Sequence, residues 1–558
     1  MNLRMPVGID DFKEVREKYY FVDKTPFIQK LLLEHSKVTL FTRPRRFGKT
    51  LTMSMLKYFF AWEDAKDSEK LFAGLTVSTE EESMRQRGKY PVVFITLRDI
   101  KSLHWQDAYA DLKGLIEDTY ARFAYLQESD KLTKREKELI AELLAGSAEE
   151  TLYRRSLKYL TEFLYKHHQV RPILLIDEYD VPIQCGWENG YYDEVMMFMK
   201  VWLSGGLKTN VHLEFAVLTG VLRVVKESIF SDLNNLEICS VMTEKYSDVF
   251  GFTKQEVKKI AADFGRPDKM NELQAWYDGY SFGGKEIYNP WSVIQYFATG
   301  CEPQPYWLNT SRNGIIKALL ETVSEARMEA LRAVLSNKYI ESVIDEGVIY
   351  ADIGQKENAL YTMLLMTGYL TLAKKEKLDA LTTFYYLRIP NLEIMQVYRG
   401  EILERMAKSV ATKQQNEFFR ALLSGQRDMF EQRLQEMLLQ MVSYYDTQNK
   451  ESFYHGFLLG LTALLAASYQ VESNRESGRG RFDLALFPKR TDQTGVIMEF
   501  KVADEPEKLE ETAQAALRQI QEKAYIAEFQ KRNIVNVYRC GVAFCGKMVR
   551  IVQGESDL

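Results

Sequence analysis

The chain has 558 residues, of which 46% are hydrophobic and 27% are charged. This length and balance are ordinary for a globular protein of two to four domains with sizeable cores. The formal net charge of −5 excludes a global electrostatic attraction to nucleic acid or acidic membranes, so any such contact must come from local patches.

The five cysteines are few and mostly scattered, which predicts a reducing compartment. Cys540 and Cys545 are too sparse for a zinc site and are expected to be buried small residues. The first residues lack the apolar core of a signal peptide, and no uninterrupted apolar run approaches about 18 residues. We therefore expect a cytoplasmic protein without a membrane span.

In the first 250 residues, predicted strands alternate with predicted helices. A loop precedes a helix at 26–33, and a helical stretch at 104–168 contains a charged linker at 131–138. The apolar strands are typical of buried, mostly parallel sheets, and they cover residues 38–41, 91–97, 172–176, 213–218 and 237–241. This alternation predicts a three-layer α/β domain over residues 1–250.

Residues 40–50 (Leu-Phe-Thr-Arg-Pro-Arg-Arg-Phe-Gly-Lys-Thr) join the first strand to a predicted helix. A helix that opens with Gly-Lys-Thr after a strand and a tight turn is how a phosphate-binding loop is built, because its free N–H groups and positive dipole end face the phosphates. Lys49 would reach the β- and γ-phosphates, and the Thr50 hydroxyl would bind Mg²⁺. Arg43 stands where the full pattern has glycine, so a basic turn before a surface helix is the alternative. The loop residues predicted to bind nucleotide are Arg46, Phe47, Gly48, Lys49 and Thr50.

Two carboxylates, Asp177 and Glu178, follow a buried strand at the edge where open α/β sheets bind ligands. Asp177 would hold Mg²⁺ through water, and Glu178 would orient or deprotonate the attacking water. At the end of the next strand, Thr219 can sense the γ-phosphate, and Arg223 just beyond it can offset transition-state charge. The alternatives are a solvated acidic loop for the carboxylates, a turn residue for Thr219 and a solvated charge for Arg223.

From residue 251 the pattern becomes mainly helical. Thr253 and Glu256 have the spacing of a capped helix start. The Gly- and aromatic-rich stretch at 276–292 is expected to close a small lid core rather than to stack on a base. Helices at 310–370 and a hairpin of strands at 370–373 and 383–389, with a charged connection at 374–379, favour a helical lid and a winged-helix-like region over 251–400, followed by a helical linker over 401–450.

The last region, 451–558, begins with an apolar helix and continues with two strands, at 478–487 and 495–502. A symmetric turn centred near Thr491 places Asp483 directly across from Glu499, with Cβ atoms roughly 5 Å apart. Lys501 shares that face. Adjacent carboxylates repel each other, and a divalent cation relieves this repulsion; hard oxygen ligands suit Mg²⁺ or Mn²⁺. The cation would activate a bound water that Lys501 would orient. The alternative is a salt-bridged strand face.

The helix that follows adds Gln519 and Lys523, four residues apart on one face, which could reach a phosphodiester backbone. The predicted catalytic residues are therefore Glu178, Asp483, Glu499, Lys501 and Gln519. The predicted metal ligands are Thr50, Asp177, Asp483 and Glu499.

Several segments together resemble a known bacterial architecture. Arg-Pro-Arg-Arg-Phe-Gly-Lys-Thr, Leu-Leu-Ile-Asp-Glu-Tyr-Asp, Leu-Thr-Gly-Val-Leu-Arg and Tyr-Asp-Gly-Tyr…Tyr-Asn-Pro-Trp-Ser resemble the AAA-ATPase-like family. The segment Ser-Asn-Arg-Glu-Ser-Gly-Arg-Gly-Arg-Phe-Asp…Glu-Phe-Lys resembles the PD-(D/E)XK nuclease superfamily domain often fused behind it. The resemblance implies a P-loop ATPase that uses Lys49, Thr50, Asp177 and Glu178, followed by a nuclease triad of Asp483, Glu499 and Lys501.

We therefore expect an α/β enzyme that uses ATP and Mg²⁺, with Mn²⁺ possible at the second site, and that acts on a nucleic acid. The alternative is an ATP-bound switch whose last domain binds nucleic acid or protein without cutting. The sequence leaves the oligomeric state open.

Overall fold

The computed structural model describes residues 4–223, 235–307, 334, 339–347, 352, 356, 358–379, 382–398, 412–441, 451–462, 465, 468–477, 480–490, 493–523 and 525–554. The chain forms two compact units, Met1–Met395 and Gln396–Leu558. No helix in the described ranges is long and apolar enough to cross a bilayer.

A five-stranded parallel sheet is the centre of the first unit. Its strands are β1 (Val38–Thr42), β2 (Val92–Thr96), β3 (Ile173–Asp177), β4 (Ala216–Gly220) and β5 (Leu236–Cys239). The strand order is β2-β3-β4-β1-β5, and all neighbouring pairs are parallel. β1, β3 and β4 are buried along their whole length, as expected for strands covered on both faces. The predicted strands are confirmed, and the carboxyl ends of these three meet at one edge.

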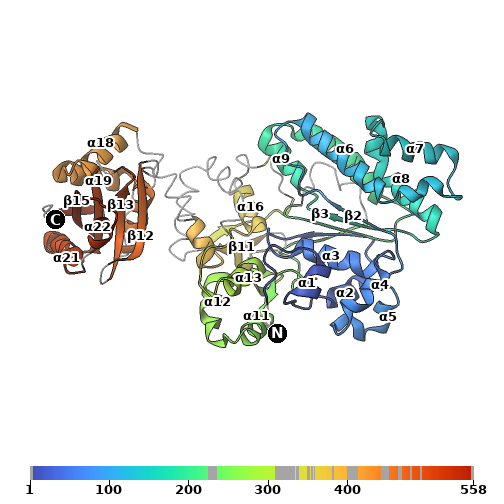
Figure 1. The fold of residues 1–558 in the computed structure, drawn as a ribbon, viewed down its shortest axis with the longest axis horizontal. Coiled ribbons are helices and arrows are strands. Elements are labelled where there is room, and N and C mark those ends of the chain that lie inside the picture. Colours follow the sequence, from blue (N-terminus) through green and yellow to red (C-terminus); the bar gives the residue numbers. More distant parts are fainter. Residues whose placement is uncertain are drawn as a thin grey trace. The chain divides into compact units, whose positions relative to one another are not determined.

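Helices cover both faces of this sheet. Figure 1 shows α1 to α5 on one side and α6 to α9 on the other. The helices are α1 (Phe12–Lys18), α2 (Pro26–Glu34), α3 (Lys49–Phe60), α4 (Ala65–Phe72), α5 (Glu81–Met84), α6 (Trp105–Ala121), α7 (Lys134–Leu144), α8 (Glu150–His168), α9 (Val181–Asn189) and α10 (Tyr192–Leu207). The predicted three-layer α/β arrangement is therefore present.

Two local expectations for this region are wrong. The loop expected before residue 26 contains α1, whose N-cap Asp11 accepts a hydrogen bond from the backbone N–H of Glu14 at 2.8 Å. The charged linker expected at 131–138 contains the start of α7, because Thr133 and Glu136 form a capping box. In both cases a local capping interaction starts a helix within a polar stretch.

The rest of the first unit combines helices with two small sheets. The helices are α11 (Lys254–Asp263), α12 (Met270–Tyr277), α13 (Pro290–Ala298) and α16 (Ala359–Thr367). The sheets have the orders β6-β8-β7 (Phe252–Thr253, Lys285–Tyr288, Tyr280–Phe282) and β10-β11-β9 (Thr371–Lys377, Thr383–Arg388, Ile340–Ser342). The capping box at the start of α11 is confirmed. The expected hairpin is present as β10 and β11, although residues 374–377 belong to β10 and not to the connection.

The aromatic residues at 276–292 form part of a core, as expected. Tyr277, Tyr280 and Tyr288 are at most 1% exposed, and Tyr277 and Tyr288 pack in one cluster with Tyr296. Much of the helical stretch expected at 310–370 lies outside the described residues.

The second unit is a mixed five-stranded sheet with helices. Its strand order is β12-β13-β14-β15-β16, with β14 and β15 parallel and the other pairs antiparallel. The strands are β12 (Tyr469–Ser477), β13 (Gly480–Pro488), β14 (Gly495–Val502), β15 (Val537–Cys545) and β16 (Met548–Gly554); the helices are α18 (Thr412–Leu423), α19 (Arg427–Met441), α20 (Glu451–Thr462), α21 (Leu509–Glu522) and α22 (Ala527–Lys531). Cys540 is buried and Cys545 is half-buried.

The β13–β14 hairpin has the predicted register. Leu484 lies opposite Met498, and Leu486 lies opposite Val496. The predicted turn centre near Thr491 lies outside the described residues. α21 lies so close to β15 that a Cβ on Gly541 would come within 2.2 Å of the carbonyl oxygen of Ala513. This helix therefore packs against β15, and it also contacts β14, the strand that carries Glu499.

Candidate functional site

The loop between β1 and α3 has the geometry of a phosphate-binding loop. Gly48 is the N-cap of α3 with φ 82°, and Arg46 also has a left-handed φ, 71°. The Nζ of Lys49 donates to the carbonyl oxygens of Arg43 and Pro44 at 3.0 and 2.9 Å. Burial lowers the pKa of Lys49. The lysine is therefore held inside the curve of the loop, at the N-terminus of the helix.

The carboxyl ends of three strands bring Thr50, Asp177 and Thr219 together. Thr50 Oγ1 donates to Asp177 Oδ2 at 2.7 Å, and Thr219 Oγ1 donates to the other carboxylate oxygen. The backbone N–H of Glu178 donates to Thr219 Oγ1 at 3.3 Å. A hydroxyl and a carboxylate side by side are hard oxygen donors, so these residues fit Mg²⁺ that also binds phosphates.

Glu178 has φ 53°, a left-handed conformation that a residue with a Cβ rarely adopts. Its carboxyl is half-buried, and burial raises its pKa while Lys49 opposes the rise. Strained backbone held in place by its surroundings is typical of functional sites.

Asp180 is a residue of this site that the sequence analysis missed. Its Oδ2 accepts the backbone N–H groups of Val221 and Leu222 at 2.7 and 2.9 Å. The hydroxyl of Tyr179 donates to the carbonyl oxygen of Leu222 at 2.6 Å. Both residues fasten the chain where it leaves β4, directly after Gly220. A third carboxylate, three residues after Asp177, was the available signal.

Arg43, which replaces the expected glycine, is a structural residue. Its side chain is fully buried (0% exposed) and donates to the carbonyl oxygens of Thr42, Cys239 and Tyr246 at 2.9, 2.7 and 3.2 Å. Its guanidinium also lies over the Phe282 ring, 5.2 Å from the centroid. Arg43 therefore anchors the base of the loop.

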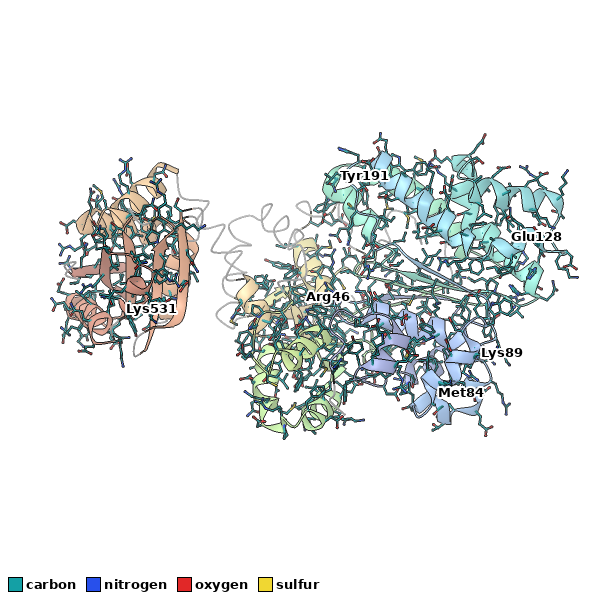
Figure 2. The ribbon with its side chains drawn as sticks, in the orientation of Figure 1. Arg46, Met84, Lys89, Glu128, Tyr191 and Lys531 are labelled. Carbon is teal, nitrogen blue, oxygen red and sulfur yellow. The ribbon has the colours of Figure 1, made fainter. Side chains whose placement is uncertain are left out.

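The following loop residues are also tied to the α11–α13 region. The Trp307 Nε1 donates to the carbonyl oxygen of Arg45 at 3.3 Å, and the Arg46 guanidinium lies 4.4 Å from the Trp291 ring centroid. The Phe47 ring packs on Tyr280 and Phe282. Figure 2 shows Arg46 where the loop meets this region.

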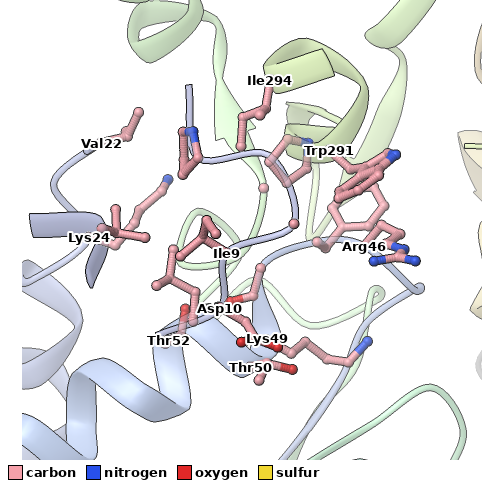
Figure 3. A pocket seen from close by; sticks show the side chains of 18 of the residues that line it. Ile9, Asp10, Val22, Lys24, Arg46, Lys49, Thr50, Thr52, Trp291 and Ile294 are labelled. Carbon is pink, nitrogen blue, oxygen red and sulfur yellow. Dashed lines mark hydrogen bonds between the residues drawn. The ribbon is translucent and has the colours of Figure 1, made fainter. Parts of the chain in front are cut away.

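A cavity of about 320 Å³ opens in front of the loop. Lys49, Thr50 and Glu178 line it, together with residues of the N-terminal segment and of α13. Figure 3 shows Arg46 beside Trp291, with Lys49, Thr50 and Asp10 in the same cavity. Arg223 follows β4 in the chain, as expected, but it is not among the described residues that line this cavity.

In the second unit, Asp483 sits where the ladder between β13 and β14 ends. The register of the paired residues, continued by one position, places Asp483 opposite Glu499. Asp483 Oδ2 accepts the backbone N–H of Phe500 at 2.7 Å. The Nε2 of His455 lies 2.8 Å from the carbonyl oxygen of Asp483, and because a carbonyl only accepts, this nitrogen carries the proton. His455, which the sequence analysis did not assign, thus holds the Asp483 backbone.

Glu499 is 3% exposed and has one oxygen engaged. Gln519 Nε2 donates to its Oε1, and its Oε2 is buried without a hydrogen-bond partner among the described residues. Burial, and next the charge of Asp483, raise the pKa of Glu499 to about 8, while Lys501 opposes the rise. Burial also raises the pKa of Asp483. An unpartnered carboxylate oxygen beside a second carboxylate fits a divalent cation, which would supply the missing positive charge.

The structure therefore brings Asp483, Glu499, Lys501 and Gln519 together, and Lys523 follows α21 as an exposed C-cap residue. Glu451 at the start of α20 is a further carboxylate in this neighbourhood, because burial and then Asp483 raise its pKa. Within the described part of the chain, no group of three or more His, Cys, Asp or Glu side chains has the arrangement of a metal site.

Comparisons with known proteins agree with this division. Residues 6–230 match the AAA-ATPase-like family, described as a predicted AAA-ATPase, and residues 449–554 match the PD-(D/E)XK nuclease superfamily. The chain is also 27% identical, over 97% of its length and 96% of the relative's, to a protein of Azotobacter chroococcum mcd 1 named "Uncharacterized protein in vnfD 5'region". The chain therefore carries a domain of the AAA-ATPase-like family followed by a C-terminal domain of the PD-(D/E)XK nuclease superfamily.

Proposed function

We propose that the first unit binds and hydrolyses Mg·ATP and that the second unit cleaves phosphodiester bonds of a nucleic acid with Mg²⁺ or Mn²⁺. The observation that carries the proposal is the buried, unpartnered Oε2 of Glu499 next to Asp483. A carboxylate oxygen in that state costs folding free energy, which a bound cation would recover.

At the first site, Lys49 contacts the β- and γ-phosphates, and Thr50 and Asp177 hold Mg²⁺. Glu178 orients and deprotonates the attacking water. Thr219 senses the γ-phosphate, and it is hydrogen-bonded to the Asp177 carboxylate and to the backbone N–H of Glu178. Arg46, Phe47 and Gly48 shape the loop around the phosphates. Apolar side chains of the same cavity, including Val22 and Ile294, provide a surface for the base.

At the second site, Asp483 and Glu499 hold the cation, which supplies charge neutralisation and a more acidic bound water. Lys501 orients that water, and Gln519 fixes the rotamer of Glu499. His455 keeps the Asp483 backbone in place through its Nε2–H. The chemistry requires a substrate phosphate within reach of both carboxylates.

Two substitutions test these assignments separately. Lys49→Ala is expected to abolish ATP turnover while leaving metal-dependent cleavage measurable, and Asp483→Ala is expected to abolish cleavage while leaving ATP turnover intact. Full turnover in Lys49→Ala would remove the phosphate-loop assignment, and unchanged cleavage in Asp483→Ala would remove the metal site. Tight ATP binding with negligible turnover, and no cleavage of DNA or RNA with either metal, would select an ATP-bound switch instead.

A further inference from the structure

The cavity in front of the phosphate loop is strongly cationic, although the whole chain is acidic. Two carboxylates line it, Asp10 and Glu178. The cations that line it are Lys24, Arg45, Arg46, Lys49, Arg98 and Lys101. This excess of positive charge is what a bound triphosphate requires.

Three of these cations are engaged by groups other than a nucleotide. Lys24 pairs with Glu256 at 2.7 Å, and the Arg45 guanidinium donates to Gln184 at 2.8 Å. Arg46 lies over the Trp291 ring. Arg98 is a fourth, since its guanidinium pairs with Asp10 of the same cavity. Lys49 has its role in the phosphate loop, and Lys101 lies, like Arg98, in the segment that follows β2.

The register of the sheet places Arg98 beside the acidic pair. Thr96 at the end of β2 lies opposite Asp177 at the end of β3, and the N–H of Leu97 donates to the carbonyl oxygen of Asp177 at 3.0 Å. Continued by one position, this register places Leu97 level with Glu178, and Arg98 is the next residue of the chain. The end of β2 thus faces the same cavity as the residues proposed to activate water.

An ion pair holds the Arg98 side chain without removing it from solvent. Its Nη1 lies 2.7 Å from Asp10 Oδ2, and its side chain is 45% exposed. Asp10 is the main cause of the raised pKa of Arg98, and the charge of Glu178 contributes to it as well. The guanidinium is therefore fixed in orientation and lies within electrostatic reach of Glu178.

We propose that Arg98 is a catalytic residue that contacts the terminal phosphate of the nucleotide in the same chain, and that Asp10 positions it. This inference rests on the proposed ATPase function. In the reaction, water oxygen bonds to the γ-phosphorus, the bond to the β,γ-bridging oxygen breaks, ADP leaves with that oxygen, and the water proton passes to Glu178. Negative charge spreads over the transferring phosphoryl oxygens, and a planar guanidinium can pair with two of them. The chain then needs no arginine from a second protomer.

ATP turnover in the variants Arg98→Ala and Arg98→Lys tests the proposed contact between Arg98 and the terminal phosphate. Arg98→Ala is expected to lower kcat at least about 100-fold with a small change in KM, as for other arginines that stabilise this transition state. Arg98→Lys is expected to recover part of kcat, because the charge remains but the bidentate geometry is lost. Arg135→Ala, which removes an arginine of α7 that is 69% exposed and outside the cavity, is the matched control. Wild-type kcat in Arg98→Ala would overturn the inference.

Mixing variants distinguishes a contact in the same chain from one between chains. Lys49→Ala alone is expected to be inactive, and Arg98→Ala alone is expected to keep only its residual turnover. An equimolar mixture of the two variants is expected to show no more turnover than Arg98→Ala by itself. Recovery of turnover in the mixture would show that Arg98 serves a neighbouring protomer, and would overturn the inference.

A binding measurement separates this inference from the proposed function. Mg·ADP with aluminium fluoride, a mimic of the transferring phosphoryl group, is expected to bind wild type more tightly than Mg·ADP alone, and Arg98→Ala is expected to lose only this extra affinity. Equal extra affinity in Arg98→Ala would overturn the role of Arg98 alone. A wild type that binds neither nucleotide form would remove the nucleotide site itself, and the inference with it.

Discussion

Two buried glutamates, one in each unit, have the same raised pKa but different surroundings. Burial is the main cause for both, and it raises the pKa of Glu393 to about 8 and that of Glu499 to about 8. Both side chains are almost inaccessible, at 0% and 3% exposed. Burial and pKa alone therefore do not distinguish a structural carboxylate from a ligand.

The hydrogen bonds make the distinction. Ser292 Oγ lies 2.9 Å from each carboxylate oxygen of Glu393, and the N–H of Trp307 donates to Oε1 at 2.8 Å. Both oxygens of Glu393 are thus satisfied within the fold. Glu499 keeps a buried oxygen without a partner among the described residues and has Asp483 as a neighbour. The first glutamate joins α13 and Trp307 to the chain before the second unit. The second keeps the unpartnered oxygen that the proposed cation would bind.

The most direct test of the difference between Glu393 and Glu499 is to neutralise each carboxylate in turn and to measure cleavage. Glu499→Gln is expected to lower Mg²⁺- or Mn²⁺-dependent cleavage by on the order of 1,000-fold, because a neutral amide does not replace a charged metal ligand. Glu393→Gln, the matched control, is expected to leave cleavage within a few-fold of wild type. Equal losses in both variants would show that the effect is on folding rather than on the site.

The second test measures the stability of the first unit, for which we expect Glu393 to matter and Glu499 not to matter. Glu393→Ala is expected to lower the free energy of unfolding of the first unit by about 3 kcal/mol, because it leaves buried polar groups of Ser292 and Trp307 without partners. All seven tryptophans lie between residues 62 and 307, so tryptophan fluorescence during urea unfolding reports on the first unit. Glu499→Ala is expected to leave that transition unchanged. A shift of less than about 0.5 kcal/mol in Glu393→Ala would contradict the structural role.

Metal affinity sharpens the comparison further. Mn²⁺ binding, measured by isothermal titration calorimetry without nucleotide, is expected to weaken at least about 10-fold in Gln519→Ala, because Gln519 orients Glu499. Glu393→Gln is expected to bind Mn²⁺ as wild type does. Unchanged affinity in Gln519→Ala would remove its orienting role.

The most gradual effect is the dependence of stability on pH. Because the folded pKa of Glu393, about 8, lies above its ordinary value of 4.5, the folded first unit binds more protons than the unfolded chain between these values. Stability from this residue is fully present below pH 4.5 and is lost as pH rises through 8, with a slope of at most about 1.4 kcal/mol per pH unit. Glu393→Gln is expected to make the urea midpoint, measured by tryptophan fluorescence, less dependent on pH between pH 6 and 8. An identical pH profile in wild type and Glu393→Gln would show that the raised pKa does not belong to Glu393.

The residues that sequence could predict are those whose partners are set by local geometry. Side chains in a strand alternate between its two faces, and this alternation with a short connection was enough to place Asp483 across from Glu499. A helix that starts directly after a strand was enough to place Gly48 and Lys49 at a helix N-terminus. Strand ends in a parallel sheet likewise predicted Asp177 and Thr219 together.

The contacts that sequence missed join distant segments. Gln519 was predicted to reach a phosphodiester backbone, whereas in the structure it donates to Glu499 because α21 packs against β14 and β15. The partners of Glu393 lie 86 and 101 positions away along the chain. Arg43 looked like a defect of the loop because its acceptors, the carbonyl oxygens of Cys239 and Tyr246, are 196 and 203 residues downstream. Such pairings arise from packing, which no local pattern encodes.

The anchoring of residues 43–47 has a consequence during synthesis. The groups that hold them include the carbonyl oxygen of Tyr246 and the rings of Phe282 and Trp291, all of which leave the ribosome after β5. A nascent chain that ends at residue 230 contains the Gly-Lys-Thr sequence and the acidic pair but none of these supports. We therefore expect the proposed nucleotide site to be complete only after about 80 further residues, as far as Trp307, have been translated and folded onto the loop.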